Sequence, residues 1–185
     1  MKMKIAIILG SVREDRKSDK VATYLMRLLE KQFEVETIML DLLDYSFPVM
    51  KERFRLLENP SESMSEFSTI LNQSDGIIIV TPEYNGSYSG ALKNTLDYYK
   101  QEYVRKPMGV VTVSSGSWGG INASHHLLSW ILHVKAIPSP YKLMIQNVNS
   151  VFKDNNELLD EKFEGKASDF LKEFIWLTGA ISRKD

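Results

Sequence analysis

The sequence predicts an α/β fold in which a five-stranded, mostly parallel sheet carries helices on both faces. Two observations support this prediction. Short apolar segments alternate with helical patterns along the whole 185-residue chain, which is typical of right-handed β-α-β crossovers. The segment "DGIIIV" is apolar at consecutive positions, as expected for a strand that is covered on both faces.

Five short apolar segments are predicted as strands, and longer periodic segments between and after them as helices. The predicted strands are "KIAIILG" (4–10), "EVETIML" (34–40), "GIIIVT" (76–81), "PMGVVTVSS" (107–115) and "YKLMIQN" (141–147). The predicted helices span 19–32, 62–73, 90–101, 120–133 and 156–182. Since no Ser/Gly linker, repeat or low-complexity tract interrupts the alternation, we expect one domain over residues 1–185.

Five strands in this alternation most simply form a doubly wound, flavodoxin-like sheet of strand order 2-1-3-4-5. Ligands of such sheets bind beyond the carboxyl ends of strands 1, 3 and 4. The loops at these ends are "GSVREDRKSDK", "TPEYNGSYSG" and "SSGSWGGINAS", the parts of the chain richest in Gly, Ser and Asn. The sequence therefore predicts a ligand site where the three loops meet.

Composition excludes several classes of function. The chain has no cysteine, so disulfides, thiolate metal sites and a Cys nucleophile are excluded, and any redox role requires a cofactor. The formal net charge is −1 without a basic stripe, which argues against nucleic acid as a partner. No apolar segment has the length of a membrane span, and the N-terminal segment lacks signal-peptide features, so we expect a cytoplasmic protein without membrane association.

The first loop has features of a phosphate site. A helix is predicted to begin near Ser18, so its first backbone N–H groups can face an anion. Ser11 offers a hydroxyl, and Arg13 and Arg16 offer forked donors suited to phosphate oxygens. Alternatively, Ser18 only caps the helix and the basic residues are solvated. Neither G-x-G-x-x-G nor a P-loop is present, which favours a nucleotide monophosphate over a dinucleotide.

The second loop has the residues of a tight turn after a buried strand. Pro82 stiffens the exit from the strand, while Asn85 and Gly86 tolerate the positive φ that such a turn requires. The turn can line the edge of a flat heterocycle, with Tyr84 stacking on it or covering it, and Glu83 can fix the loop by accepting backbone hydrogen bonds. The alternative is a strand-to-helix turn in which Tyr84 is simply packed.

The third loop combines small residues with one large aromatic. Gly116, Gly119 and Gly120 allow the backbone to approach a ligand closely. Trp118 can serve as a lid, as a subunit contact or as ordinary packing. The loop is therefore a third candidate wall of the same site.

Other catalytic patterns are missing. His125, His126 and His133 lie on one predicted helix, but their spacing gives no i, i+4 metal pair, so a metal site is not predicted. Ser114 and Ser115 lack the G-x-S-x-G elbow of hydrolases. Neither metal-dependent nor hydrolytic chemistry is indicated.

The segments "GSVREDR", "TPEYNGSYSGALKNTLDY" and "SSG…GG" together resemble the NADPH-dependent FMN reductase family over essentially the whole chain. The resemblance implies an FMN-dependent oxidoreductase that takes hydride from NADPH or NADH. It implies small-molecule acceptors such as quinones, azo compounds or free flavin. It implies no side-chain acid or base, because the cofactor carries the chemistry.

The resemblance also assigns residues to the cofactor. It implies that the phosphate is held by Ser11, Arg13, Arg16, Ser18, Asp19 and Lys20. It places Pro82, Glu83, Tyr84, Asn85 and Gly86 at the isoalloxazine ring, with a backbone N–H near Asn85 or Gly86 facing flavin N5, and Ser114, Ser115 and Gly116 on the other side or at the ribityl chain. The chain departs from the family pattern at Asp19, Lys20, Ser89 (commonly Pro) and Asn122 (often basic).

Family resemblance further implies a homodimer or homotetramer. Tyr98, Tyr99, Tyr103 and Trp118 are predicted to be exposed and to contribute a shared apolar surface. Two other functions remain open. A flavodoxin-like electron carrier is disfavoured because the chain lacks a strong acidic charge, and a non-catalytic FMN-binding sensor uses the same loops. The physiological acceptor and the choice between NADH and NADPH also remain open.

Overall fold

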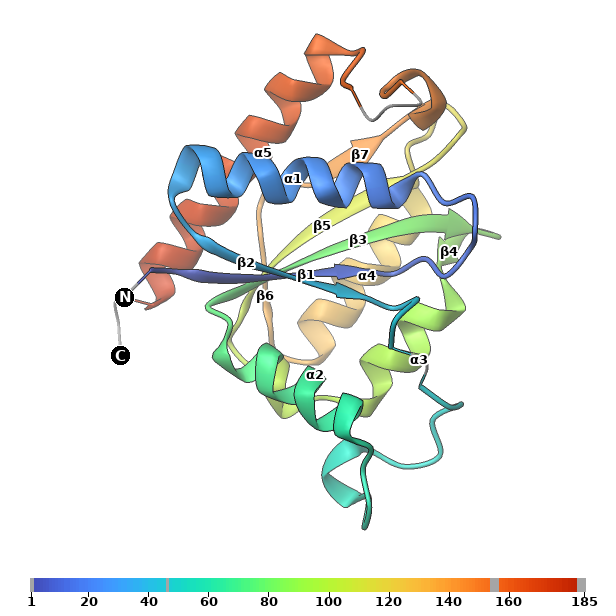
Figure 1. Ribbon diagram of the computed structural model, residues 1–185, viewed down its shortest axis with the longest axis vertical. Helices are drawn as coiled ribbons and strands as arrows, with labels where there is room; N and C mark the ends of the chain where they lie inside the picture. The colour runs from blue at the N-terminus through green and yellow to red at the C-terminus, as the bar shows by residue number, and fades with distance from the viewer. Residues whose placement is uncertain (1, 46, 154–156, 183–185) are drawn as a thin grey trace.

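The computed structural model describes residues 2–45, 47–153 and 157–182. Its parallel sheet has the order β2-β1-β3-β5, with the fifth position filled by two short strands that both pair with β5 (Figure 1). The strands are β1 (Lys4–Leu9), β2 (Glu36–Asp41), β3 (Gly76–Tyr84), β5 (Pro107–Val113), β6 (Ile137–Pro138) and β7 (Leu143–Ile145). The predicted flavodoxin-like order is confirmed, with the difference that the fifth strand is split.

Strand β3 extends three residues beyond its predicted end. Its last residues fold back on β4 (Ser87–Tyr88), so that Glu83 pairs with Tyr88 and Tyr84 with Ser87. The two-residue turn has φ of 50° at Asn85 and 77° at Gly86, the pattern of a type I′ hairpin, which Asn-Gly favours. The positive φ predicted at these two positions is confirmed.

Helices cover both faces of the sheet. Figure 1 shows α1 (Ser18–Phe33) and α5 (Glu161–Ser182) on one side and α2 (Glu62–Gln73), α3 (Gly90–Tyr98) and α4 (Ile121–His133) on the other. Short 3-10 turns occur at η1 (Phe54–Leu56), η2 (Gln101–Tyr103) and η3 (Val148–Ser150). Within the described residues, no helix combines the length and the apolar character needed to cross a bilayer.

Two predicted helix boundaries differ from the structure by more than one residue. The third helix ends at Tyr98 rather than at residue 101, because Tyr99 has extended backbone angles. The last helix begins at Glu161, and its predicted first residue, Asn156, lies outside the described residues.

The side chains of β1 divide between two hydrophobic clusters. Ile5, Ile7 and Leu9 pack with the α1 and α5 layer, and Ala6 and Ile8 pack with the α2, α3 and α4 layer. Alternate residues of a strand point to opposite faces, and all five of these side chains are buried. The consecutive apolar pattern therefore reflects burial on both faces, as predicted.

The prediction that Tyr98, Tyr99 and Tyr103 form an exposed surface is wrong. They are 3%, 2% and 0% exposed. The η2 turn after α3 brings this segment into the α2–α4 layer, where the Tyr99 ring stacks on Phe67 with centroids 5.3 Å apart. The hydroxyls of Tyr98 and Tyr99 each donate to a backbone carbonyl at 3.0 Å. Of the four aromatic residues predicted to be exposed, only Trp118 is, with 75% of its surface accessible.

Ser89 ties the end of β1 to the start of α3. It is the N-cap of α3, where its hydroxyl oxygen accepts a hydrogen bond from the Leu92 N–H at 3.1 Å. The same hydroxyl donates to the Gly10 carbonyl, and the side chain is buried. Proline, which the family resemblance leads us to expect at this position, has no hydroxyl to make either bond. The departure at Ser89 thus has a structural role.

We expect Ser89→Ala to lower the free energy of unfolding by about 1–2 kcal/mol, because it removes a helix cap and leaves the Gly10 carbonyl without this donor. Urea unfolding followed by far-UV circular dichroism measures the change. The matched control is Ser61→Ala, which removes the exposed cap of α2. A loss at Ser89 no larger than the loss at Ser61 would contradict the buried double role.

Candidate functional site

A cavity of about 280 Å³ opens at the carboxyl ends of β1, β3 and β5. The three loops predicted to meet at a ligand site all contribute to its walls. The lining residues are Ser11, Arg13, Asp15, Arg16, Lys17, Ser18, Pro82, Glu83, Tyr84, Val113, Ser114, Ser115, Val148 and Asn149. The predicted location of the site is therefore supported by an actual cavity.

Most of the predicted cofactor-binding residues line this cavity, but five described ones do not. Asp19, Lys20, Asn85, Gly86 and Gly116 lie outside the lining. The Lys20 ammonium donates to the Lys153 carbonyl at 2.9 Å. Asn85 and Gly86 form the tip of the β3–β4 hairpin, beyond the cavity wall that Tyr84 contributes.

Sequence reasoning missed the contribution of the fifth strand. Val148 and Asn149 follow β7 and line the cavity. Parallel strands end at the same edge of a sheet, so the polar segment "QNVNS", which begins in the last two residues of the predicted fifth strand, was a usable signal. Asp15, Lys17 and Val113 were also missed, although all three adjoin predicted residues.

The start of α1 has an unused hydrogen-bonding group. Ser18 is 2% exposed, and its hydroxyl has no hydrogen-bond partner among the described residues. The N-cap position is Lys17, whose side chain makes no capping bond. The alternative in which Ser18 serves as the helix cap is therefore not supported. A buried hydroxyl beside the N–H groups of a helix start is suited to an anion.

Tyr84 connects the first two loops at one end of the cavity. Its hydroxyl lies 3.1 Å from that of Ser11, which is fully buried. The Arg13 guanidinium lies over the Tyr84 ring, with the carbon Cζ 5.8 Å from the ring centroid, a cation–π distance. Tyr84 thus contacts the predicted phosphate loop rather than packing into the core.

Glu83 fastens the second loop to α4. Its carboxylate accepts backbone hydrogen bonds from Asn122 at 2.9 Å and Ala123 at 3.1 Å. The Asn122 side-chain amide also donates to it, at 3.4 Å. A carboxylate at a helix N-terminus is favoured by the helix dipole. The prediction that Glu83 accepts backbone bonds is confirmed, and the departure at Asn122 supplies one of its partners.

The third loop packs closely on its own sheet. Gly120 has φ of 80°, and a Cβ there would lie 2.8 Å from Thr112 Cβ. The Thr112 hydroxyl donates to the Gly119 carbonyl at 2.7 Å. Gly119 and Gly120 are buried, so their small size serves this packing of the chain, while Ser114 and Ser115 face the cavity.

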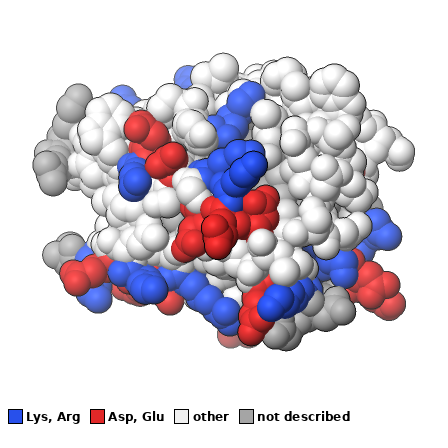
Figure 2. Space-filling model, turned by 90° about the horizontal axis from the view of Figure 1, so that it is seen from above, with Lys and Arg blue, Asp and Glu red and all other residues white. Residues whose placement is uncertain are grey.

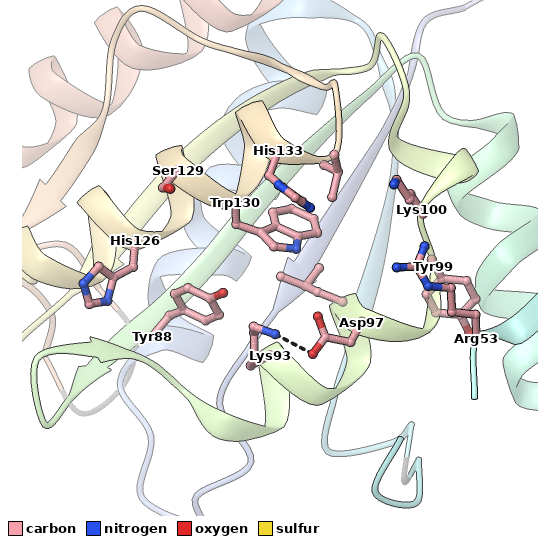
Figure 3. Close-up of a pocket in the computed structure, with 12 residues that line it drawn as sticks. Arg53, Tyr88, Lys93, Asp97, Tyr99, Lys100, His126, Ser129, Trp130 and His133 are labelled. Carbon is pink, nitrogen blue, oxygen red and sulfur yellow. Dashed lines mark hydrogen bonds and ion pairs between the residues drawn. The ribbon is translucent and has the colours of Figure 1, made fainter. Parts of the chain in front are cut away.

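A second groove, of about 450 Å³, lies between α3 and α4 (Figure 3). Side chains of α4 point across it toward β4 and α3, and Lys93 forms an ion pair with Asp97 at 2.5 Å. Burial, and secondarily the charge of Asp97, raises the pKa of Tyr88 to about 12. The groove is lined by Arg53, Tyr88, Lys93, Leu96, Asp97, Tyr99, Lys100, His126, Ser129, Trp130, His133 and Val134.

The three histidines take no part in a cluster suited to a metal. Within the described residues, no group of three or more His, Cys, Asp or Glu side chains is arranged to hold a metal ion. His126 instead contacts the Ser87 hydroxyl through Nδ1 at 2.9 Å. This contact connects α4 to the β3–β4 hairpin.

Comparison with known proteins identifies the family. The family model for NADPH-dependent FMN reductases matches residues 3–150. The chain belongs to this family. An NADPH azoreductase of Bacillus sp. is 31% identical over 80% of this chain and 79% of its own. A quinone reductase of Pseudomonas putida is 29% identical over 92% of this chain and 90% of its own.

A solved structure supports the same relationship. The flavoenzyme NAD(P)H:(acceptor) oxidoreductase from Paracoccus denitrificans has a TM-score of 0.80 and 26% identity, covering 95% of this chain and 97% of its own. The predicted family, the flavodoxin-like fold and the enzymatic class are therefore confirmed. FMN and a nicotinamide dinucleotide are the cofactors of this chain.

The cavity has the donors that an FMN phosphate requires. The buried Ser18 hydroxyl lacks a partner among the described residues, and the N-terminus of α1 adjoins it. The Arg13 guanidinium has no carboxylate partner in the described part of the chain. A helix N-terminus, a hydroxyl and a guanidinium together match the geometry and charge of a phosphate.

We expect Glu83→Gln to lower the free energy of unfolding by about 1 kcal/mol, because an amide replaces the charged acceptor at the start of α4. We also expect weaker FMN binding, since the hairpin is less firmly held. Urea unfolding and FMN fluorescence titration measure the two effects. Glu173→Gln, an exposed change on α5, is the control, and equal behaviour of both variants would contradict this role of Glu83.

Proposed function

We propose that this reductase binds FMN in the cavity at the carboxyl edge of the sheet and uses NAD(P)H to reduce flat acceptors such as quinones, azo compounds or free flavin. When bound, FMN supplies the chemistry of accepting a hydride and passing on electrons. The observation that carries the proposal is the buried Ser18 hydroxyl at the start of α1, which lines the cavity and has no hydrogen-bond partner among the described residues. Relatives named azoreductase and quinone reductase support the choice of acceptors.

The chain's own residues bind and orient the cofactor. Ser11, Arg13 and Ser18 would hold the phosphate, and Ser114 and Ser115 would contact the other side of the ring or the ribityl chain; all five line the cavity. We expect the β3–β4 hairpin to lie beside the ring when FMN is bound, and a backbone N–H of Asn85 or Gly86, at the hairpin tip, would then face flavin N5. Its rigidity, from Glu83 and the type I′ turn, keeps these groups in place.

Surface charge favours a reductase over a dedicated electron carrier. The formal net charge is −1. Acidic and basic side chains lie close together on the face that Figure 2 displays, without a broad field of one sign. A carrier that docks protein partners is expected to have a strongly charged face for steering, and a nucleic-acid-binding protein a basic one. Small molecules are therefore the partners we propose.

The decisive measurement is an anaerobic absorption titration of the FMN-loaded protein with NADPH and with NADH. We expect at least one of them to bleach the flavin band rapidly and an added quinone to restore it. The ratio of the two rates gives the donor preference.

Riboflavin in place of FMN provides the control for the phosphate site. Bound FMN that stays oxidised with both donors would indicate a carrier or sensor. Failure to bind FMN would overturn the proposal altogether.

We also propose that the chain forms a homodimer through the α3–α4 face, with a pair of dimers as the larger alternative. One face of α3 carries both Lys93 and Asp97, and Lys100 lies just beyond the helix. In two copies related by a twofold axis, basic side chains of one copy can therefore form ion pairs with acidic side chains of the other. The partly exposed Trp130 ring in the groove offers apolar area to the partner. Trp118, 75% exposed, is a second candidate contact.

Sedimentation equilibrium tests the proposed dimer, and we expect twice the mass of one chain. Ser129→Arg places a bulky charge at the exposed rim of the groove and is expected to shift the protein to monomer. Ala180→Arg, on the exposed side of α5, is the control and is expected to remain dimeric. A monomeric wild-type protein, or an unchanged mass for Ser129→Arg, would contradict this interface.

Two further expectations stay proposals. We place the protein in the cytoplasm, because its nicotinamide donors are intracellular metabolites. We treat residues 1–185 as one domain, since the described strands form one sheet and the helices pack on its two faces.

A further inference from the structure

The guanidinium of Arg16 is already engaged by the protein. Its Nη1 donates to the Asp41 carboxylate and to the Ser11 carbonyl, both at 2.6 Å. Its Nη2 donates to the other oxygen of Asp41. Such a two-pronged pair between Arg and a carboxylate is strong and directional. Arg16 therefore has three acceptors on its own chain, although it lines the cavity.

Asp41 lies where it can fix the first loop. It is the last residue of β2 and stands in register with Leu9, the last residue of β1. Its carboxylate also accepts the Leu43 N–H at 3.0 Å. The side chains of Arg16 and Asp41 are only 12% and 18% exposed. Removing one partner of such a pair leaves the other charge poorly solvated, so the pair acts as a unit.

Arg16 orients the backbone of the first loop through the Ser11 carbonyl. A trans peptide places its C=O and the following N–H on opposite sides. The Ser11 carbonyl points to Arg16, so the Val12 N–H points away from Arg16. The orientation of this peptide, in the loop that enters the N-terminus of α1, thus depends on the position of Arg16.

Arg13 has a different environment from Arg16. It is exposed, and within the described residues its guanidinium contacts the Tyr84 ring and no carboxylate. A guanidinium that has no carboxylate to give up contacts an incoming phosphate at lower cost than one held in an ion pair.

We propose that Asp41 is a positioning residue for the cofactor phosphate: it holds Arg16 against the Ser11 carbonyl and so fixes the phosphate loop, while Arg13 is the cation that contacts the phosphate. This inference rests on the proposed FMN site. It gives Arg16 an indirect role, in place of the direct phosphate contact that family resemblance implies, and it gives Asp41 a role that sequence reasoning did not assign.

The test is a double-mutant cycle on flavin affinity. Asp41→Asn, Arg16→Gln and the double variant are titrated with FMN and with riboflavin by flavin fluorescence. We expect each single change to weaken FMN binding by about tenfold and riboflavin binding much less, because the loop acts on the phosphate. The double variant is expected to be no weaker than the worse single variant, since the pair acts as a unit.

Two further variants are measured beside the double-mutant cycle. Arg13→Gln is expected to weaken FMN binding, and this loss should add to that of Asp41→Asn. Asp44→Asn removes an exposed carboxylate three residues away and is the control. The ratio of FMN to riboflavin affinity is the decisive readout, since general destabilisation lowers both affinities alike.

Three outcomes would overturn the inference. In the first, Arg16→Gln weakens FMN binding while Asp41→Asn does not, which would make Arg16 a direct phosphate ligand. In the second, Asp41→Asn lowers FMN and riboflavin affinity equally, which would make Asp41 purely structural. In the third, Arg13→Gln leaves FMN affinity unchanged. If the wild-type chain does not bind FMN, the proposed function fails first, and the two failures are thus distinguishable.

Discussion

The burial of β1 and β3 on both faces is the constraint on which the rest of the structure depends. The side chains Ile5–Leu9 and Ile77–Val80 are almost completely excluded from solvent, so neither face of the sheet can hold a ligand. Only the ends of the strands are left as places where the sheet can bind a ligand. At the carboxyl edge, the loops from parallel strands converge and helices begin with unpaired N–H groups. A cavity lined by these loops at the carboxyl edge is the direct consequence of this arrangement.

Three polar interactions, here called ties, stabilise the loops at this edge: hydrogen bonds of Ser89 and of Glu83, and the ion pair between Arg16 and Asp41. Ser89 joins the end of β1 to α3, Glu83 joins the hairpin to α4, and Asp41 joins β2 to the first loop through Arg16. Each tie connects segments that are far apart in sequence and involves a buried or charged group. Since a cofactor that needs no side-chain acid or base depends on position, these ties determine how well the cavity is organised before the cofactor binds.

The local sequence was sufficient to predict the helices, the strands and the hairpin turn. It was insufficient to predict the contacts between segments that are far apart in the chain. Continuous apolar runs specify β1 and β3, and Asn85-Gly86 specifies the turn because few other pairs accept two positive φ values. The fifth strand is split because Pro138 and Pro140 lack the N–H of a regular ladder. The burial of Tyr99 and Tyr103 was missed, since a short 3-10 turn after α3 leaves no periodic signal for their direction.

Arg13 and Arg16 show why motif reading alone does not assign a phosphate ligand. The two residues are of the same type, in the same loop and three positions apart, and both line the cavity. Their difference comes from Asp41, which is 25 positions further along the chain than Arg16 and reaches it only through the β1–β2 register. A guanidinium balanced by a carboxylate contributes order to the loop, while an unbalanced one contributes net charge to the cavity. The number of arginines in such a loop therefore overstates the positive charge available to the phosphate whenever the neighbouring strand ends in an acidic residue.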